Sequence, residues 1–193
     1  MFILSDEAYS DFLLDNENFI SLGNLDREKT HTIIVNSISK NYGISGWRIG
    51  YVITNKNLIN QILKVNQHLI TCPATILEYY IEKHFFDIIK ITKPQIKEVV
   101  QKRKKVAEYL EKLGIFCLQG TATFYLFASI APSKLDSVTF GNRLLDEYHI
   151  CVVPGIGYGD SCDAFVRIAV GTESMERTLR GLDKMKELIE KTC

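Results

Sequence analysis

The sequence predicts an α/β or α+β fold, because segments typical of strands alternate with segments typical of helices along the whole chain. Short runs of β-branched and apolar residues, such as 32–35 (TIIV) and 165–170 (FVRIAV), predict strands. Between such runs, apolar residues recur every three or four positions, which is the period of an amphipathic helix. The 193 residues contain no internal repeat and no linker rich in Pro, Gly or Ser.

The first half of the chain is expected to contribute three strands and then helices. Strands are predicted at residues 2–5, 32–35 and 47–54. The last of these is mostly apolar, so we expect both of its faces to be buried. Helical spacing of apolar residues then follows at Leu58, Ile62, Val65 and Leu69 and, after Pro73, at Ile76, Leu77, Tyr80, Ile81, His84 and Phe85.

A charged helix is predicted to begin near Pro94, which a first helical turn tolerates, and to stop at Gly114. Glutamates surround its basic run at 102–105, so we expect a solvated face there and not a nucleic-acid site. We place a boundary at this helix, dividing the chain into domains 1–93 and 94–193.

The second domain is expected to combine short strands with two helices. Strands are predicted at residues 115–118, 123–130, 150–153 and 165–170, and a helix at 138–148. A final helix would begin after Ser174 as its N-cap. One face of that helix would carry Met175, Leu179, Leu182, Met185 and Ile189.

Composition excludes several functional classes. The 23 basic and 23 acidic residues balance, whereas proteins that bind nucleic acid are usually basic. No segment is apolar enough to span a bilayer, and no signal peptide is visible, so we expect neither a nucleic-acid nor a membrane partner. The five cysteines are scattered and never at C-x-x-C spacing, which fits reduced thiols and a cytoplasmic location. The four histidines are also dispersed, so no metal site is expected.

Three local features are unusual in combination. They are DEAY at residues 6–9, SISKNYGISGWRIGY at 37–51, and Arg167 inside an apolar strand. Each alone has an ordinary explanation: a turn after a strand, a surface lysine, and a buried ion pair. The glycines at 155, 157 and 159 precede a strand and not a helix, so we interpret them as a turn and not as a nucleotide-binding loop.

Together these features resemble the class I/II aminotransferases, which are fold-type-I pyridoxal-phosphate-dependent enzymes. The segment at 37–51 resembles the lysine segment of that family, and DEAY resembles its preceding Asp-x-x-Tyr. TATFYLF, VVPGIGYGD and AFVRIAVGTES follow in the order found in the C-terminal lobe. The resemblance implies the C-terminal part of this fold, with a partial large-domain sheet in 1–93 and an α+β small domain in 94–193.

The resemblance implies a pyridoxal 5'-phosphate site in the first domain. Lys40 matches the catalytic lysine that binds the cofactor aldehyde and later moves the α-proton. Asp6 matches the carboxylate that keeps the pyridine nitrogen protonated, and Tyr9 matches the phenol that hydrogen-bonds the ring oxygen. Ser37 and Arg48 match the phosphate ligands, and an arginine offers a planar fork to phosphate oxygens.

The resemblance also implies a substrate site. Arg167 matches the arginine that binds the α-carboxylate of the substrate. A guanidinium among apolar strand residues is costly to bury unless an anion pairs with it, which favours this interpretation. The implied reaction is amino-group transfer between an amino acid and a 2-oxo acid.

Family members are longer, and the resemblance begins midway through them. We therefore expect a truncated gene product, a fragment or half of a split enzyme, inactive alone, with an open apolar edge at strand 2–5. The implied partners are the missing N-terminal half or a second copy in a homodimer. Two alternatives stay open: a sister reaction of the same cofactor, such as decarboxylation or β-elimination, and a non-catalytic fragment or partner module.

Overall fold

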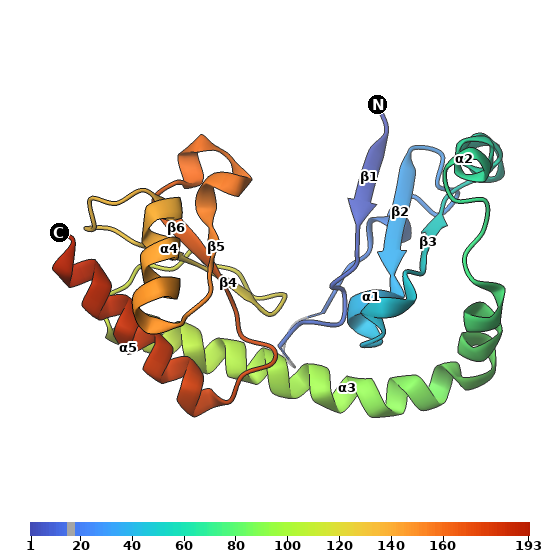
Figure 1. Cartoon of the computed structure of the whole chain (residues 1–193). Coiled ribbons are helices and arrows are strands. Elements are labelled where there is room, and N and C mark those ends of the chain that lie inside the picture. Colours follow the sequence, from blue (N-terminus) through green and yellow to red (C-terminus); the bar gives the residue numbers. More distant parts are fainter. Residues whose placement is uncertain (15–17) are drawn as a thin grey trace. The chain divides into compact units, whose positions relative to one another are not determined.

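The structure, a computed structural model, describes residues 1–14 and 18–193 and divides into two units, Met1–Lys97 and Glu98–Cys193 (Figure 1). The division lies four residues after the domain boundary predicted at 93/94. Strands and helices alternate in both units, so the predicted α/β class is confirmed.

A three-stranded sheet organises the first unit, in the order β1 (Ile3–Asp6), β2 (Thr32–Ser37) and β3 (Gly50–Ile53) (Figure 1). β1 and β2 are parallel, with Asp6 opposite Val35. β3 runs antiparallel to β2, with Gly50 opposite Ser37. The carboxyl ends of β1 and β2 and the start of β3 therefore meet at one edge of this sheet.

The strand predicted at 47–54 is shorter than expected. Ser45–Trp47 forms a 3-10 turn and Arg48 has left-handed backbone angles (φ 56°, ψ 42°), so β3 starts only at Gly50. A Cβ at Gly50 would come within 2.8 Å of the Asn36 carbonyl oxygen, which explains the glycine at this close pairing. The prediction of burial on both faces is wrong, because Tyr51 is 42% exposed.

Helices follow this sheet along the chain. α1 (Ile38–Asn41) comes directly after β2, and α2 (Lys56–Leu69) begins where the Asn55 side chain accepts a hydrogen bond from Leu58 N at 3.1 Å. α3 (Thr75–Lys112) then runs from the first unit into the second.

The predicted helix start at Pro94 is wrong, because α3 continues through this residue. Proline lacks the N–H that would bond the carbonyl one turn earlier, so the helix loses one hydrogen bond there. The helix nevertheless persists, and the next turns bury Ile96 and Val100, which are 7% and 2% exposed. Burial of apolar side chains in the turns after the proline can offset one missing bond.

An antiparallel sheet organises the second unit, in the order β4 (Tyr125–Ser129), β6 (Phe165–Ala169) and β5 (Val153–Pro154). The strand predicted at 115–118 is reduced to one bridge, between Cys117 and Ala128, and that predicted at 150–153 is largely loop. α4 (Ser137–Tyr148) and α5 (Met175–Lys191) complete the unit, with 3-10 turns at Gly155–Tyr158 and Asp160–Cys162.

One face of this second sheet packs into the main core. Alternation along the strands directs Leu126, Ala128 and Val166 into it, at 3%, 0% and 0% exposure. The core also takes buried residues from the helices: Val106, Leu110, Phe140, Leu144, Leu182, Met185, Leu188 and Ile189. Ser174 caps α5 as predicted, accepting a hydrogen bond from Arg177 N at 3.2 Å.

The basic run at 102–105 was expected to form a solvated face, but one of its residues is buried. Arg103 is only 8% exposed, and its Nε donates to the Tyr125 carbonyl at 3.0 Å. The reason is the helical period, which turns this position toward β4 while Lys104 and Lys105 remain exposed.

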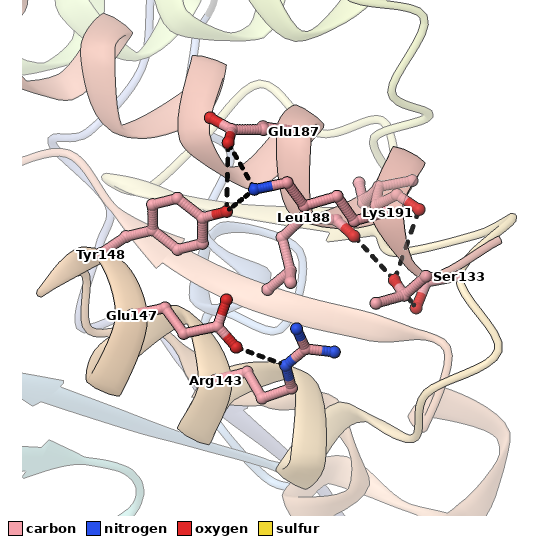
Figure 2. Close-up of polar contacts among 9 residues, drawn as sticks. Ser133, Arg143, Glu147, Tyr148, Glu187, Leu188 and Lys191 are labelled. Carbon is pink, nitrogen blue, oxygen red and sulfur yellow. Dashed lines mark hydrogen bonds and ion pairs between the residues drawn. The ribbon is translucent and has the colours of Figure 1, made fainter.

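Polar contacts join α4 to α5 at the surface of the second unit. Figure 2 shows Tyr148, at the end of α4, beside Glu187 and Lys191 of α5. Lys191 Nζ donates to the Tyr148 hydroxyl at 3.0 Å and to Glu187 Oε1 at 2.7 Å.

Among the described residues, no helix is long and apolar enough to cross a membrane.

Candidate functional site

Five of the six predicted site residues gather at one edge of the first sheet. They are Asp6, Tyr9, Ser37, Lys40 and Arg48. Parallel pairing of β1 with β2 brings the ends of these two strands together, although about thirty residues of chain separate them. Antiparallel pairing of β3 adds the segment before Gly50 to the same edge.

Asp6 is the last residue of β1. Its carboxylate is exposed and accepts a hydrogen bond from Ala8 N at 3.1 Å, which turns the chain away from the strand. Tyr9 lies in this turn, with its ring 5.8 Å from that of Phe12. Phe12 is 4% exposed and anchors the turn to the interior of the first unit.

Lys40 lies in α1, immediately after β2, and its side chain is half-buried. Ser37 precedes this short helix, and its hydroxyl accepts a hydrogen bond from Ser39 N at 3.1 Å. Ile38 is 4% exposed, and this burial fixes the position of the helix against the sheet. The strand-to-helix transition therefore presents a hydroxyl and an amine three residues apart.

Arg48 reaches the same edge from the other direction. It lies two residues before Gly50, the register partner of Ser37. Its guanidinium is exposed, and Nη1 donates to the Ser45 carbonyl at 2.9 Å. A left-handed backbone at a residue other than glycine is strained, and such strain is concentrated at functional sites.

Sequence reasoning assigned no role to Glu7, a buried residue whose hydrogen bonds support this edge. Glu7 is 6% exposed and accepts hydrogen bonds from Ser5 Oγ at 3.2 Å and Ser21 Oγ at 2.8 Å. Its backbone N–H donates to the Val35 carbonyl at 2.8 Å. A buried carboxylate satisfied in this way fixes the backbone next to Asp6. The only signal in the sequence was an acidic residue following a strand.

A second polar cluster lies near the same turn. Asn41 is buried and donates to Ser10 Oγ at 3.0 Å, while its Oδ1 has no hydrogen-bond partner among the described residues. Burial raises the pKa of the Tyr42 phenol, and Tyr51 and Asp11 raise it further. Burial also raises the pKa of the Asp11 carboxyl. The Tyr42 phenol therefore remains a protonated hydrogen-bond donor at neutral pH.

Arg167, the sixth predicted residue, lies in the second unit at the centre of β6. Phe127 of β4 is its register partner. Its guanidinium carbon lies 4.4 Å from the centre of the Tyr125 ring and 5.6 Å from that of Tyr158. In the part of the chain that the structure describes, its buried Nε has no hydrogen-bond partner. Tyr158 was not predicted, because only the path of the 3-10 turn before β6 brings its ring beside Arg167.

The glycine-rich segment before β6 is a turn, as expected. It forms the 3-10 turns Gly155–Tyr158 and Asp160–Cys162, and the next regular element is β6 and not a helix. This arrangement lacks the helix N-terminus that a phosphate-binding glycine loop needs.

Comparison with known proteins agrees with this geometry. Residues 1–182 match the family described as aminotransferase class I and II. An aspartate aminotransferase of Pyrococcus abyssi is 30% identical over 191 residues, covering 98% of this chain and 49% of the relative. A (5-formylfuran-3-yl)methyl phosphate transaminase of Methanocaldococcus jannaschii is 32% identical, covering 98% and 50%.

A solved structure supports the same conclusion. The aromatic aminotransferase of Pyrococcus horikoshii OT3 superposes with a TM-score of 0.89 at 29% identity, covering 99% of this chain and 52% of the other. The chain thus spans about half the length of the curated relatives it matches. Because the family match covers residues 1–182 of 193, this chain belongs to the class I and II aminotransferases.

Proposed function

We propose that the chain forms part of an aminotransferase that moves an amino group between an amino acid and a 2-oxo acid. The observation that carries this proposal is the meeting of a lysine amine, a carboxylate, a hydroxyl and a guanidinium at one sheet edge. The family is pyridoxal-phosphate dependent, and these are the groups that such a cofactor requires.

The residues present fit this cofactor. The exposed Arg48 guanidinium is held by its bond to Ser45 O, so its remaining donors are directed by a fixed backbone. Its fork geometry suits the oxygens of a phosphate. The Asp6 carboxylate is exposed at the same edge, where a protonated ring nitrogen could pair with it. A lysine amine in the adjacent helix completes the donor set.

Each residue at the edge would contribute to binding the cofactor or to its reaction. When bound, pyridoxal phosphate supplies an aldehyde for the amino group and a ring that withdraws electrons from the α-carbon. Lys40 Nζ would hold that aldehyde in the absence of substrate and would carry the proton of the substrate α-carbon. Asp6 would pair with the ring nitrogen, and Tyr9 would donate a hydrogen bond to the ring oxygen. Ser37 and Arg48 would bind the phosphate.

Arg167 would bind the α-carboxylate of the substrate. Its buried Nε has no hydrogen-bond partner among the residues that the structure describes, which supports this role, because such a donor in an apolar strand gains most when an anion arrives. The relatives are named for different substrates, so the amino acid itself is left open. A homodimer, or a further polypeptide that completes the enzyme, and a cytoplasmic location belong to the proposal, and the five free cysteines fit that location.

Labelling with pyridoxal phosphate and borohydride tests the cofactor site. Borohydride converts a lysine–cofactor adduct into a stable amine that peptide mapping can locate. We expect the label to concentrate on Lys40, with Lys40→Arg removing it and Lys64→Arg, an exposed control in α2, leaving it unchanged. Asp6→Asn should weaken cofactor binding about tenfold or more. Label spread evenly over surface lysines would refute the assignment of this edge as a cofactor site.

The products of a single turnover distinguish the alternatives. The cofactor-loaded protein, incubated with an amino acid, should release one 2-oxo acid per bound cofactor, because the amino group stays on the cofactor. Carbon dioxide instead would indicate a decarboxylase, and ammonia with pyruvate a β-lyase. Labelling of Lys40 without any of these products would favour a non-catalytic cofactor-binding module.

A further inference from the structure

We propose that Tyr158 is a positioning residue, which holds the Arg167 guanidinium in the orientation that binds a carboxylate. The inference rests on the proposed function, because it takes Arg167 as the carboxylate site. It adds a second component: the segment 155–163, here called the Tyr158 loop, is fixed to α4 by a buried serine. All of these residues lie within the second unit.

Two aromatic rings lie beside the Arg167 guanidinium. Its guanidinium carbon lies over the rings of Tyr125 at 4.4 Å and Tyr158 at 5.6 Å. Such contacts attract the positive charge to the ring face and use no N–H donor. The buried Nε indeed has no hydrogen-bond partner among the residues described. The aromatic rings thus restrict the side chain while a donor remains available for a ligand.

The Tyr158 ring is oriented by a series of aromatic contacts. Its ring meets Phe127 edge-on, with centroids 5.6 Å apart and an interplanar angle of 89°. Phe127 in turn stacks on Phe165 at 5.3 Å and 9°. Strand alternation places Tyr125 and Phe127 of β4 on the sheet face that also carries Phe165 and Arg167 of β6. Tyr158 is the only one of these aromatic residues that comes from a loop.

Ser137 attaches that loop to α4. Ser137, at the start of α4, is fully buried, and its hydroxyl donates to Asp163 Oδ1 at 2.6 Å and accepts from Ile156 N at 3.2 Å. Its backbone N–H also donates to Asp163 Oδ1, at 3.0 Å. One side chain therefore joins both ends of the Tyr158 loop to a helix of the core.

Close backbone packing adds to this constraint. A Cβ at Gly155 would lie 2.0 Å from the Cys162 carbonyl oxygen and 2.4 Å from that of Phe165. Only glycine permits the two ends of the loop to approach so closely. An arginine restrained in this way loses less side-chain freedom when it binds an anion, so its affinity is higher than that of a freely rotating arginine.

The proposal is tested by titrating the full chain with a carboxylate and monitoring the Arg167 Nε–Hε signal by NMR. The probe is propionate, and the neutral isostere propionamide is the control. We expect a saturable shift with propionate only. Tyr158→Leu should weaken binding about tenfold, whereas Tyr158→Phe, which keeps the ring face, should stay within about twofold of wild type. Tyr79→Leu, at a 68% exposed tyrosine of α3, is the matched control and should bind normally.

Two further variants separate the possible failures. Arg167→Gln should abolish propionate binding. Because this variant lacks the Nε–Hε group, binding is measured from the chemical shifts of backbone amides near residue 167, which should show no saturable change. Ser137→Ala removes the two side-chain hydrogen bonds that attach the loop, leaves the backbone bond to Asp163, and alters no aromatic ring. It should weaken propionate binding severalfold while Tyr158 is intact. It also provides the test if Tyr158→Leu does not fold.

The outcomes discriminate clearly. If wild type binds propionate and Arg167→Gln does not, but Tyr158→Leu and Ser137→Ala bind as wild type does, the positioning role is refuted and the carboxylate site stands. If wild type shows no saturable shift, the carboxylate role of Arg167 fails, and this inference fails with it. Rescue by Tyr158→Phe, together with loss in Tyr158→Leu, would support positioning by the ring.

Discussion

The two units differ in how much apolar surface they bury. The second has a continuous core of 14 buried apolar residues, whereas the buried apolar residues in the described part of the first are five: Phe12, Ile34, Ile38, Ile49 and Ile96. Among the described residues, eighteen large apolar side chains are exposed in the first unit and seven in the second. The residues proposed to hold the cofactor thus lie in the unit with less internal burial, and the proposed substrate arginine lies in the better-packed one.

The edge strand β1 illustrates this difference. It pairs with β2 on one side only in the described sheet, and Phe2 and Leu4 are 60% and 66% exposed. Exposed apolar edge strands are normally paired or covered in folded proteins. The open edge expected from the sequence is therefore present, and the first unit should gain more stability from a partner than the second.

The largest test of this comparison substitutes a core residue in one unit and an exposed residue of the same type in the other. Phe140→Ala, at a fully buried position, should destabilise the second unit by about 3–5 kcal/mol. Phe86→Ala, at a 75% exposed position, should cost less than about 0.5 kcal/mol. Native-state hydrogen exchange reads each unit separately. Equal losses would mean that the two units are equally packed in solution.

Helix caps provide a smaller test. Ser174→Ala should remove the N-cap of α5 and cost about 1 kcal/mol in the protection of second-unit amides. Asn55→Ala removes the cap of α2 and also a hydrogen bond to the Lys29 carbonyl, with a similar local cost. If the units are energetically independent, each substitution should leave protection in the other unit unchanged. Loss of protection in both units from either change would contradict independence.

The smallest expected effect is the acid dependence of the contact between α4 and α5 (Figure 2). Hydrogen bonds from Lys184 and then Lys191 lower the pKa of Glu187 from 4.5 to about 2. A lowered folded-state pKa stabilises the protein above the unfolded value, and this contribution is lost as the pH falls from about 4.5 towards 2. The Tm of Glu187→Gln should therefore fall less steeply than that of wild type over this range. Glu176→Gln on the same helix is the control, and equal slopes for Glu187→Gln and wild type would refute the assignment.

Local sequence patterns predicted much of the fold. The period of apolar residues predicted α2, α4 and α5, and Ser174 was correctly identified as a cap. Patterns failed where packing overrides local preference, as at Pro94 inside α3 and at the buried Arg103. The segment 115–118 was predicted as a strand because its residues are apolar, but strand formation also needs a continuous partner, and it has one bridge.

Local sequence is sufficient to identify the chemical groups that are present, since Lys40, Asp6 and Arg48 lie in segments typical of one enzyme family. It also determined the alternation of strands and helices, which depends on short-range periodicity. Only the tertiary structure decided that the ends of β1 and β2 and the start of β3 share an edge, and that Tyr158 lies beside Arg167. The physical reason is that strand register and loop attachment depend on contacts between residues distant in the chain, which local patterns do not encode.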